Sequence, residues 1–142
     1  MVQNRFSVAY FMVLLAALLS GCSNNEPPPA DARHIADTFY AEFIAQDIDA
    51  AITHFSPKRS PDVWRSHLAN INEQLGQVVS VKFNAEEINT VLRGRFFIFE
   101  FNVEYSSGTQ ALETMTLFHK VDEEGIFIVS HNISADGYNS LL

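Results

Sequence analysis

The sequence contains one cysteine, few basic residues and no apolar run long enough to span a membrane. Its 142 residues include nine lysines and arginines against 17 aspartates and glutamates, a formal net charge of −8. Because a phosphate backbone is bound by a basic surface, this balance argues against a nucleic-acid partner. A single cysteine forms no disulfide within the chain, so stability has to come from core packing. The apolar run at residues 8–19 is shorter than the roughly 18 residues of a spanning helix.

That apolar run leads directly into Leu19-Ser20-Gly21-Cys22, which contains the only cysteine. With Arg5 ahead of it, the run has the length of a secretory signal core, about 7 to 15 residues. The tetrapeptide resembles a bacterial lipobox. The resemblance implies cleavage before Cys22 and lipid attachment to it, with an uncleaved anchor as the alternative. Since Ser23 is not the aspartate associated with inner-membrane retention, the resemblance also implies an outer-membrane protein that faces the periplasm.

The rest of the chain has room for one domain. We expect a signal peptide at residues 1–21, then the lipidated cysteine and a proline-rich tether at 22–32. The domain would follow at 33–134, and a tail, loose or docked, at 135–142. Pro27-Pro28-Pro29 favours an extended conformation, so the tether would hold the domain up to roughly 30 Å from the bilayer.

Apolar residues recur at helical spacing after the tether. They are Ile35, Ala36, Phe39, Tyr40, Phe43, Ile44 and Ile48. Asp47 is a cap residue for a short following helix. Ser60-Pro61 marks a second helix start and Gly76 its end. Between them, Trp64, Leu68, Ile71 and Leu75 share one face.

After Gly76 the apolar period changes from helix to strand. Val79, Val81 and Phe83 alternate with Val78, Ser80 and Lys82, and a second run spans residues 88–92. A long strand at 95–105 places Phe97, Phe99, Phe101, Val103 and Tyr105 on one face. Turns at 106–109 and 122–125 then predict strands at 110–121 and 126–133. This order predicts an α+β fold, with N-terminal helices packed on a curved antiparallel sheet.

Several of these segments resemble the nuclear transport factor 2-like superfamily of cone-shaped domains. The matching residues are Phe39, Phe43, Gln46-Asp47, Ala50-Ala51, Phe55, Leu75-Gly76, Glu113 to Leu117, Gly125 and Phe127 to Ile133. The resemblance covers residues 33–134. It implies a cone fold shared with isomerases, cyclases and many bacterial lipoproteins.

Such a cone suggests a candidate pocket, which would be lined by aromatic and polar side chains. Its members would be Tyr40, Trp64, Phe97, Phe99, Phe101, Glu113, His119 and His131. Strand alternation places Glu113 and His119 on the inner face but about 20 Å apart. We expect His131 to approach His119 across the last hairpin. The alternative is that the aromatic residues form a packed core, with Glu113 facing water or a backbone amide and the histidines at the rim.

The five histidines, at 34, 54, 67, 119 and 131, show no paired ligand spacing, so we expect them to be solvated and predict neither a metal nor a cofactor. The function expected from these observations is a non-catalytic binding module, for a small apolar ligand or an envelope protein. A small isomerase-like or hydrolase-like enzyme is the first alternative. The second is a structural homodimer formed through the outer sheet face around Phe96 and Ile98.

Overall fold

Helices precede strands along the chain in a computed structural model, which describes residues 27–142. The elements are α2 (Pro29–Ile44), α3 (Ile48–Ala51), the short 3-10 helix η2 (Ile52–His54), α4 (Pro61–Leu75), β1 (Val78–Val91), β2 (Gly94–Tyr105), β3 (Gln110–Lys120), β4 (Ile126–Ala135) and β5 (Tyr138–Ser140). The predicted signal peptide and Cys22 lie outside the described residues.

The first helix begins earlier than expected. α2 starts at Pro29, so residues 29–32, assigned to the tether by sequence, are helical. Proline is well tolerated at the first helical position, where its missing N–H has no intrahelical partner. Ala32 is completely buried, as is Ala36 one turn later. The domain boundary therefore moves from residue 33 to residue 29.

The predicted helix signals at Asp47, Ser60 and Gly76 are confirmed. The Asp47 carboxylate accepts from the Ala50 backbone N–H, and the Ser60 hydroxyl accepts from the backbone N–H of Asp62. Gly76 ends α4 with a φ of +84°, in the region that glycine adopts most easily. These caps fix where each helix begins or ends.

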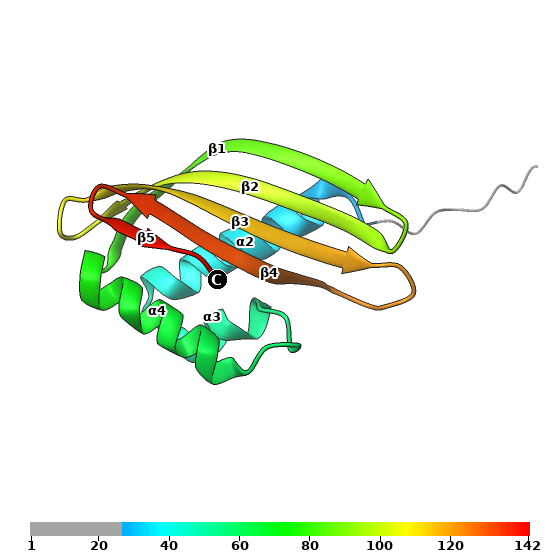
Figure 1. The fold of residues 1–142 in the computed structure, drawn as a ribbon, viewed down its shortest axis with the longest axis horizontal. Helices are drawn as coiled ribbons and strands as arrows, with labels where there is room; N and C mark the ends of the chain where they lie inside the picture. Colours follow the sequence, from blue (N-terminus) through cyan, green and yellow to red (C-terminus); the bar gives the residue numbers. More distant parts are fainter. Residues whose placement is uncertain (1–26) are drawn as a thin grey trace, which may run out of the picture.

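The five strands form one antiparallel meander in the order β1-β2-β3-β4-β5. Figure 1 shows this curved sheet with the helices gathered against one of its faces, α2 running along the sheet. The predicted α+β fold, with N-terminal helices packed on a curved antiparallel sheet, is thus confirmed. β1 lies at one edge of the sheet and β5 at the other.

The alternation predicted for the two central strands is also confirmed. On β2 the inward side chains Phe97, Phe99, Phe101, Val103 and Tyr105 are at most 1% exposed. They pack against the buried faces of α2 and α4 to form one hydrophobic core. The packing includes edge-to-face contacts such as Tyr40 with Phe101, at 4.9 Å between ring centroids.

The alternation predicted for residues 78–83 is broken at its start, because β1 contains two irregularities. A register shift between Val78 and Ser80 turns Val78 into the core and leaves Val79 59% exposed. A second shift lies between Phe83 and Ala85. The run predicted at residues 88–92 is the continuation of this strand up to Val91. Bulges of this kind reverse which residues face inward.

The C-terminal segment is docked on the domain and is not a loose tail. β4 continues to Ala135, and β5 pairs with it. The carbonyl oxygen of Leu142 accepts from the backbone N–H of His131 at 2.9 Å and from the Ser130 hydroxyl at 2.8 Å. The folded unit therefore extends past the boundary predicted at residue 134.

Candidate functional site

A carboxylate lies at the centre of the core. The side chain of Glu113 on β3 has no exposed surface and accepts three hydrogen bonds. The Tyr40 hydroxyl donates to its Oε2 at 2.7 Å, and the Tyr105 hydroxyl donates to Oε1. Nε2 of His131, itself fully buried, lies 2.8 Å from Oε2. Both oxygens of this side chain therefore have hydrogen-bond partners despite their complete burial.

Strand alternation explains why Glu113 points inward. It shares the inner face of β3 with Ala111, Met115 and Leu117, all of them buried. On the neighbouring strand β4, His131 pairs with Met115 and Ile133 pairs with Glu113. Glu113 and His131 are therefore diagonal neighbours on one face of the sheet, within reach of each other's side chains.

A row of polar groups connects this carboxylate to the surface. Nδ1 of His131 lies 3.2 Å from Nε2 of His67 on α4. Nδ1 of His67 lies 3.3 Å from the hydroxyl of Ser140 on β5. We call Glu113, His131, His67 and Ser140 the polar chain. It runs from the core, through two imidazoles, to a half-buried serine.

Burial sets the protonation of the groups around the polar chain. Loss of water, reinforced by the Glu113 charge, raises the pKa of Tyr40 and of Tyr105 well above the usual range, so both stay donors. Desolvation lowers the pKa of His67 to about 3, with further contributions from His131 and Arg59. His67 is thus neutral at physiological pH.

The outer end of the polar chain opens into a shallow hollow of about 490 Å³ between α4 and the C-terminal segment. Its lining residues are Asp62, Val63, Ser66, His67, Asn70, Ser140 and Leu142. The Asn70 side-chain oxygen accepts from the Tyr138 hydroxyl at 2.9 Å. The hollow therefore exposes the edge of a neutral imidazole among polar side chains.

The structure brings seven of the eight predicted pocket residues together. Tyr40, Trp64, Phe97, Phe99, Phe101, Glu113 and His131 are at most 3% exposed. They fill the interior of the domain by packing on each other and on the helices, as in the stacking of Trp64 on Phe55 at 4.1 Å.

The eighth residue, His119, does not join them. It lies near the end of β3, half-buried, with Ile126 as its partner on β4. His131 pairs with Met115 instead, so the predicted approach of His131 to His119 is wrong. The expectation that all five histidines are solvated is also wrong, since His67 is 7% exposed and His131 fully buried.

Sequence reasoning missed His67, Tyr105 and Ser140 as members of this site. His67 was the most accessible to prediction, because it lies three residues after Trp64 on the apolar face of α4. A histidine at helical spacing within an apolar stripe indicates a buried imidazole that needs a partner. Ser140 gave no local signal, since only the docking of β5 brings it to α4.

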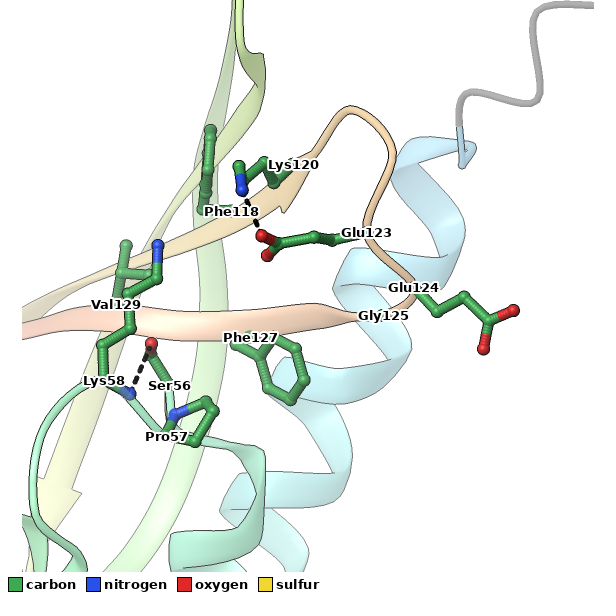
Figure 2. Close-up of a pocket in the computed structure, with 10 residues that line it drawn as sticks. All are labelled: Ser56, Pro57, Lys58, Phe118, Lys120, Glu123, Glu124, Gly125, Phe127 and Val129. Atoms are coloured by element: carbon green, nitrogen blue, oxygen red, sulfur yellow. Dashed lines mark hydrogen bonds and ion pairs between the residues drawn. The ribbon is translucent and has the colours of Figure 1, made fainter.

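Two further depressions lie elsewhere. A groove of about 440 Å³ separates α2 from β1, where the Arg33 guanidinium lies 3.9 Å from the centroid of the Phe83 ring. A cavity of about 80 Å³ lies beside the β3–β4 turn, with Phe127 at its wall and the Lys120–Glu123 ion pair at its rim (Figure 2). Small-molecule sites typically measure 300–1,000 Å³, so this cavity is too small for one.

Within residues 27–142, no group of three or more histidine, cysteine, aspartate or glutamate side chains is arranged to hold a metal ion. None of the helices in the same range is long and apolar enough to cross a membrane.

No protein-family model matches the chain, and a search of curated proteins found no match. Among solved structures, the chain is similar to Bdellovibrio bacteriovorus Bd1075, with a TM-score of 0.52 and 14% sequence identity. The similarity covers 75% of this chain and 41% of Bd1075, so the chain spans less than half the length of that protein. At this identity the similarity concerns the fold alone.

Proposed function

We propose that the protein is a lipoprotein, anchored in the outer membrane through Cys22, whose periplasm-facing domain is a non-catalytic module that binds an envelope protein. The lipobox-like sequence supports the anchor. The packing of the domain supports binding at its surface. Seven of the eight residues predicted to line an interior pocket are only 0–3% exposed, because they form a packed core. This packing favours a protein partner over an interior apolar ligand.

The surface best suited to a partner is the groove between α2 and β1. β1 is an edge strand, and no other described segment than β2 pairs with it. Phe83 and Val79 on this strand are 42% and 59% exposed, and Ile44 of α2 is 43% exposed on the opposite wall. An edge strand beside an apolar groove accepts an extended segment through backbone hydrogen bonds, with alternate side chains in the groove.

The anchor is tested by intact-mass measurement of the protein from native membranes and by the variant Cys22→Ala. We expect the wild-type chain to begin at Cys22 with the added mass of lipid, and to float with outer-membrane vesicles. Cys22→Ala should leave a chain without lipid. An unmodified wild-type chain that retains residues 1–21 would contradict the proposal.

The partner is tested with a photo-crosslinking amino acid at position 83 in cells. We expect a discrete adduct with an envelope protein. The same amino acid at Asp136, which is exposed on the β4–β5 turn, is the matched control and should give none. An adduct at both positions or at neither would contradict binding through this groove, and native mass spectrometry would then show whether a small ligand co-purifies.

The polar chain supports a second candidate function, a hydrolase-like activity at the hollow. In the tautomer of His131 that donates from Nε2 to Glu113, Nδ1 of His131 accepts from Nε2 of His67. Nδ1 of His67 is then free to accept the Ser140 hydroxyl proton at 3.3 Å. Ser140 is thus placed beside an oriented imidazole, as a serine nucleophile is beside its base, although the pKa of about 3 makes His67 a weak base. A fluorophosphonate probe should label Ser140 and spare Ser140→Ala; equal labelling of Ser66→Ala and wild type is the control.

A further inference from the structure

We propose that the turn between β1 and β2 is a membrane-contact site, which places Leu92 in the interfacial region of an anionic bilayer. The proposal rests on the lipid anchor proposed above and adds the orientation that the anchored domain takes. The surface that this turn contacts belongs to the same membrane that holds the lipid.

The turn combines high exposure with apolar character. Leu92 is 98% exposed and Val91 is 46% exposed. A single exposed leucine is ordinary on a soluble domain. Leu92, however, lies at the tip of a hairpin whose first strand is exposed from Lys82 to Val91. The tip is therefore available to a surface that approaches this end of the domain.

The charge at the tip is opposite in sign to that of the chain. The net charge is −8, yet the residue that follows Leu92 is the exposed Arg93. The Arg95 Nε donates to the Thr90 hydroxyl across the base of the turn. Basic side chains next to an apolar tip suit the boundary of an anionic leaflet, where they interact with headgroups while the apolar side chain enters the acyl region.

The start of α2, the first described helix after Cys22 in the sequence, lies at the same end of the domain as this turn. Arg33, near the start of α2, lies over the ring of Phe83, which is nearer to the turn along β1 than Val79 is. α2 therefore starts towards the β1–β2 turn, and Figure 1 shows the two at one end. Pro29 follows Cys22 by seven residues, at most about 25 Å of extended chain.

The other hairpin turn at this end carries the opposite charge. This difference indicates that the β1–β2 turn contacts the membrane and the β3–β4 turn does not. The β3–β4 turn contains Asp122, Glu123 and Glu124, all exposed, and Lys120 is paired with Glu123. An anionic surface repels these carboxylates and attracts Arg93 of the β1–β2 turn. Once the lipid holds the chain at high local concentration, weak contacts of this kind are sufficient to orient the domain.

The test uses the full lipidated chain with Leu92→Cys carrying an environment-sensitive fluorophore, since lipid occupies Cys22. In vesicles of phosphatidylethanolamine and phosphatidylglycerol, we expect emission at shorter wavelength, several-fold higher intensity, and quenching by spin-labelled lipid. The matched control is Leu141→Cys, at a position 79% exposed that lies outside the turn, which should respond as in water. Arg93→Glu added to the Leu92 probe should reduce the response, whereas Glu87→Gln on the same strand should not.

The outcomes separate this proposal from the proposed anchor. A Leu92 probe that stays water-like while the protein floats with the vesicles would overturn the contact site and leave the anchor intact. Equal responses from the probes at 92 and 141 would overturn it as well. A protein that does not float would contradict the anchor itself and the contact site together.

Discussion

Glu113 and His131 lie on neighbouring strands with 2.8 Å between Oε2 of the carboxylate and Nε2 of the imidazole, and neither side chain has exposed surface. A buried charge is tolerated only when its hydrogen bonds are made, because removing one partner leaves the other without compensation in a dry environment. Since two tyrosines also donate to Glu113, the carboxylate organises contacts from α2, β2 and β4 around β3.

Glu113→Gln should destabilise the domain. Glutamine keeps the shape of glutamate but replaces one accepting oxygen with a donating amide, so at least one of the three donors loses its partner. We expect the free energy of unfolding to fall by about 3 kcal/mol, measured by urea denaturation. The control is Glu124→Gln on the exposed β3–β4 turn, which should leave the midpoint unchanged. Equal midpoints for the two variants would show that the hydrogen bonds of Glu113 do not stabilise the fold.

Stability should fall with acidification because of His67. Its pKa is lowered to about 3 in the folded state, so between about pH 6.5 and pH 3 the unfolded chain binds a proton at this position and the folded chain does not. Protonation therefore favours the unfolded state as pH decreases. The contribution is roughly 1.4 kcal/mol per pH unit within this window.

Because carboxylates titrate in the same range, the measurement is a comparison of unfolding profiles for the wild type and His67→Asn. The difference in slope between pH 6 and pH 4 isolates the imidazole. His34→Asn, at an exposed position, should keep the wild-type slope. Parallel profiles for all three proteins would contradict a buried neutral His67.

Alternation within single strands and helices was sufficient to predict most of the core. Phe97, Phe99 and Phe101 were assigned to the inner face because they recur every second residue, and the sheet keeps that register. The alternation is broken on β1, where a bulge after Val78 shifts the phase. A bulge depends on pairing with the neighbouring strand, so the periodicity of the β1 sequence alone does not predict it.

The candidate site could be predicted only in part from the sequence, for the same reason. The sequence predicts Glu113 and His131 as candidate pocket residues. It groups Glu113 with His119, however, which shares its strand face and lies too far away. Its actual partners come from α2, β2 and β4. Contacts between elements distant in sequence require knowledge of the packing, and a single sequence offers none of it.

The two tyrosine hydroxyls should be energetically coupled through Glu113. Tyr40→Phe and Tyr105→Phe each remove one donor to the carboxylate without changing the ring, so each should cost about 1.5–3 kcal/mol. Because both donors stabilise one charge, a double-mutant cycle should show a coupling above about 0.5 kcal/mol. Tyr138→Phe, whose hydroxyl donates to Asn70 instead, should be additive with Tyr40→Phe. Strict additivity of Tyr40 and Tyr105 would contradict their shared carboxylate.

The junction between α4 and β1 should be intolerant of a side chain at Gly76. A Cβ there would lie 2.2 Å from the Ser106 hydroxyl oxygen and 3.3 Å from the Ser107 backbone nitrogen, because the β2–β3 turn packs directly on the helix end. That hydroxyl accepts from the Gln77 backbone N–H at 3.0 Å, so moving it breaks the contact that joins the turn to the junction.

Gly76→Ala therefore combines a strained backbone with a steric clash, whereas Gly108→Ala is a control for a positive φ without the clash. Gly108 has a nearly identical φ of +86° against +84°, and nothing lies within 4 Å of its Cβ position. Gly108→Ala should cost about 1–2 kcal/mol, and Gly76→Ala a further 1–3 kcal/mol, roughly. Adding Ser106→Gly should recover part of the extra loss. Equal losses for the two alanine variants in urea denaturation would show that the turn does not press on the helix end.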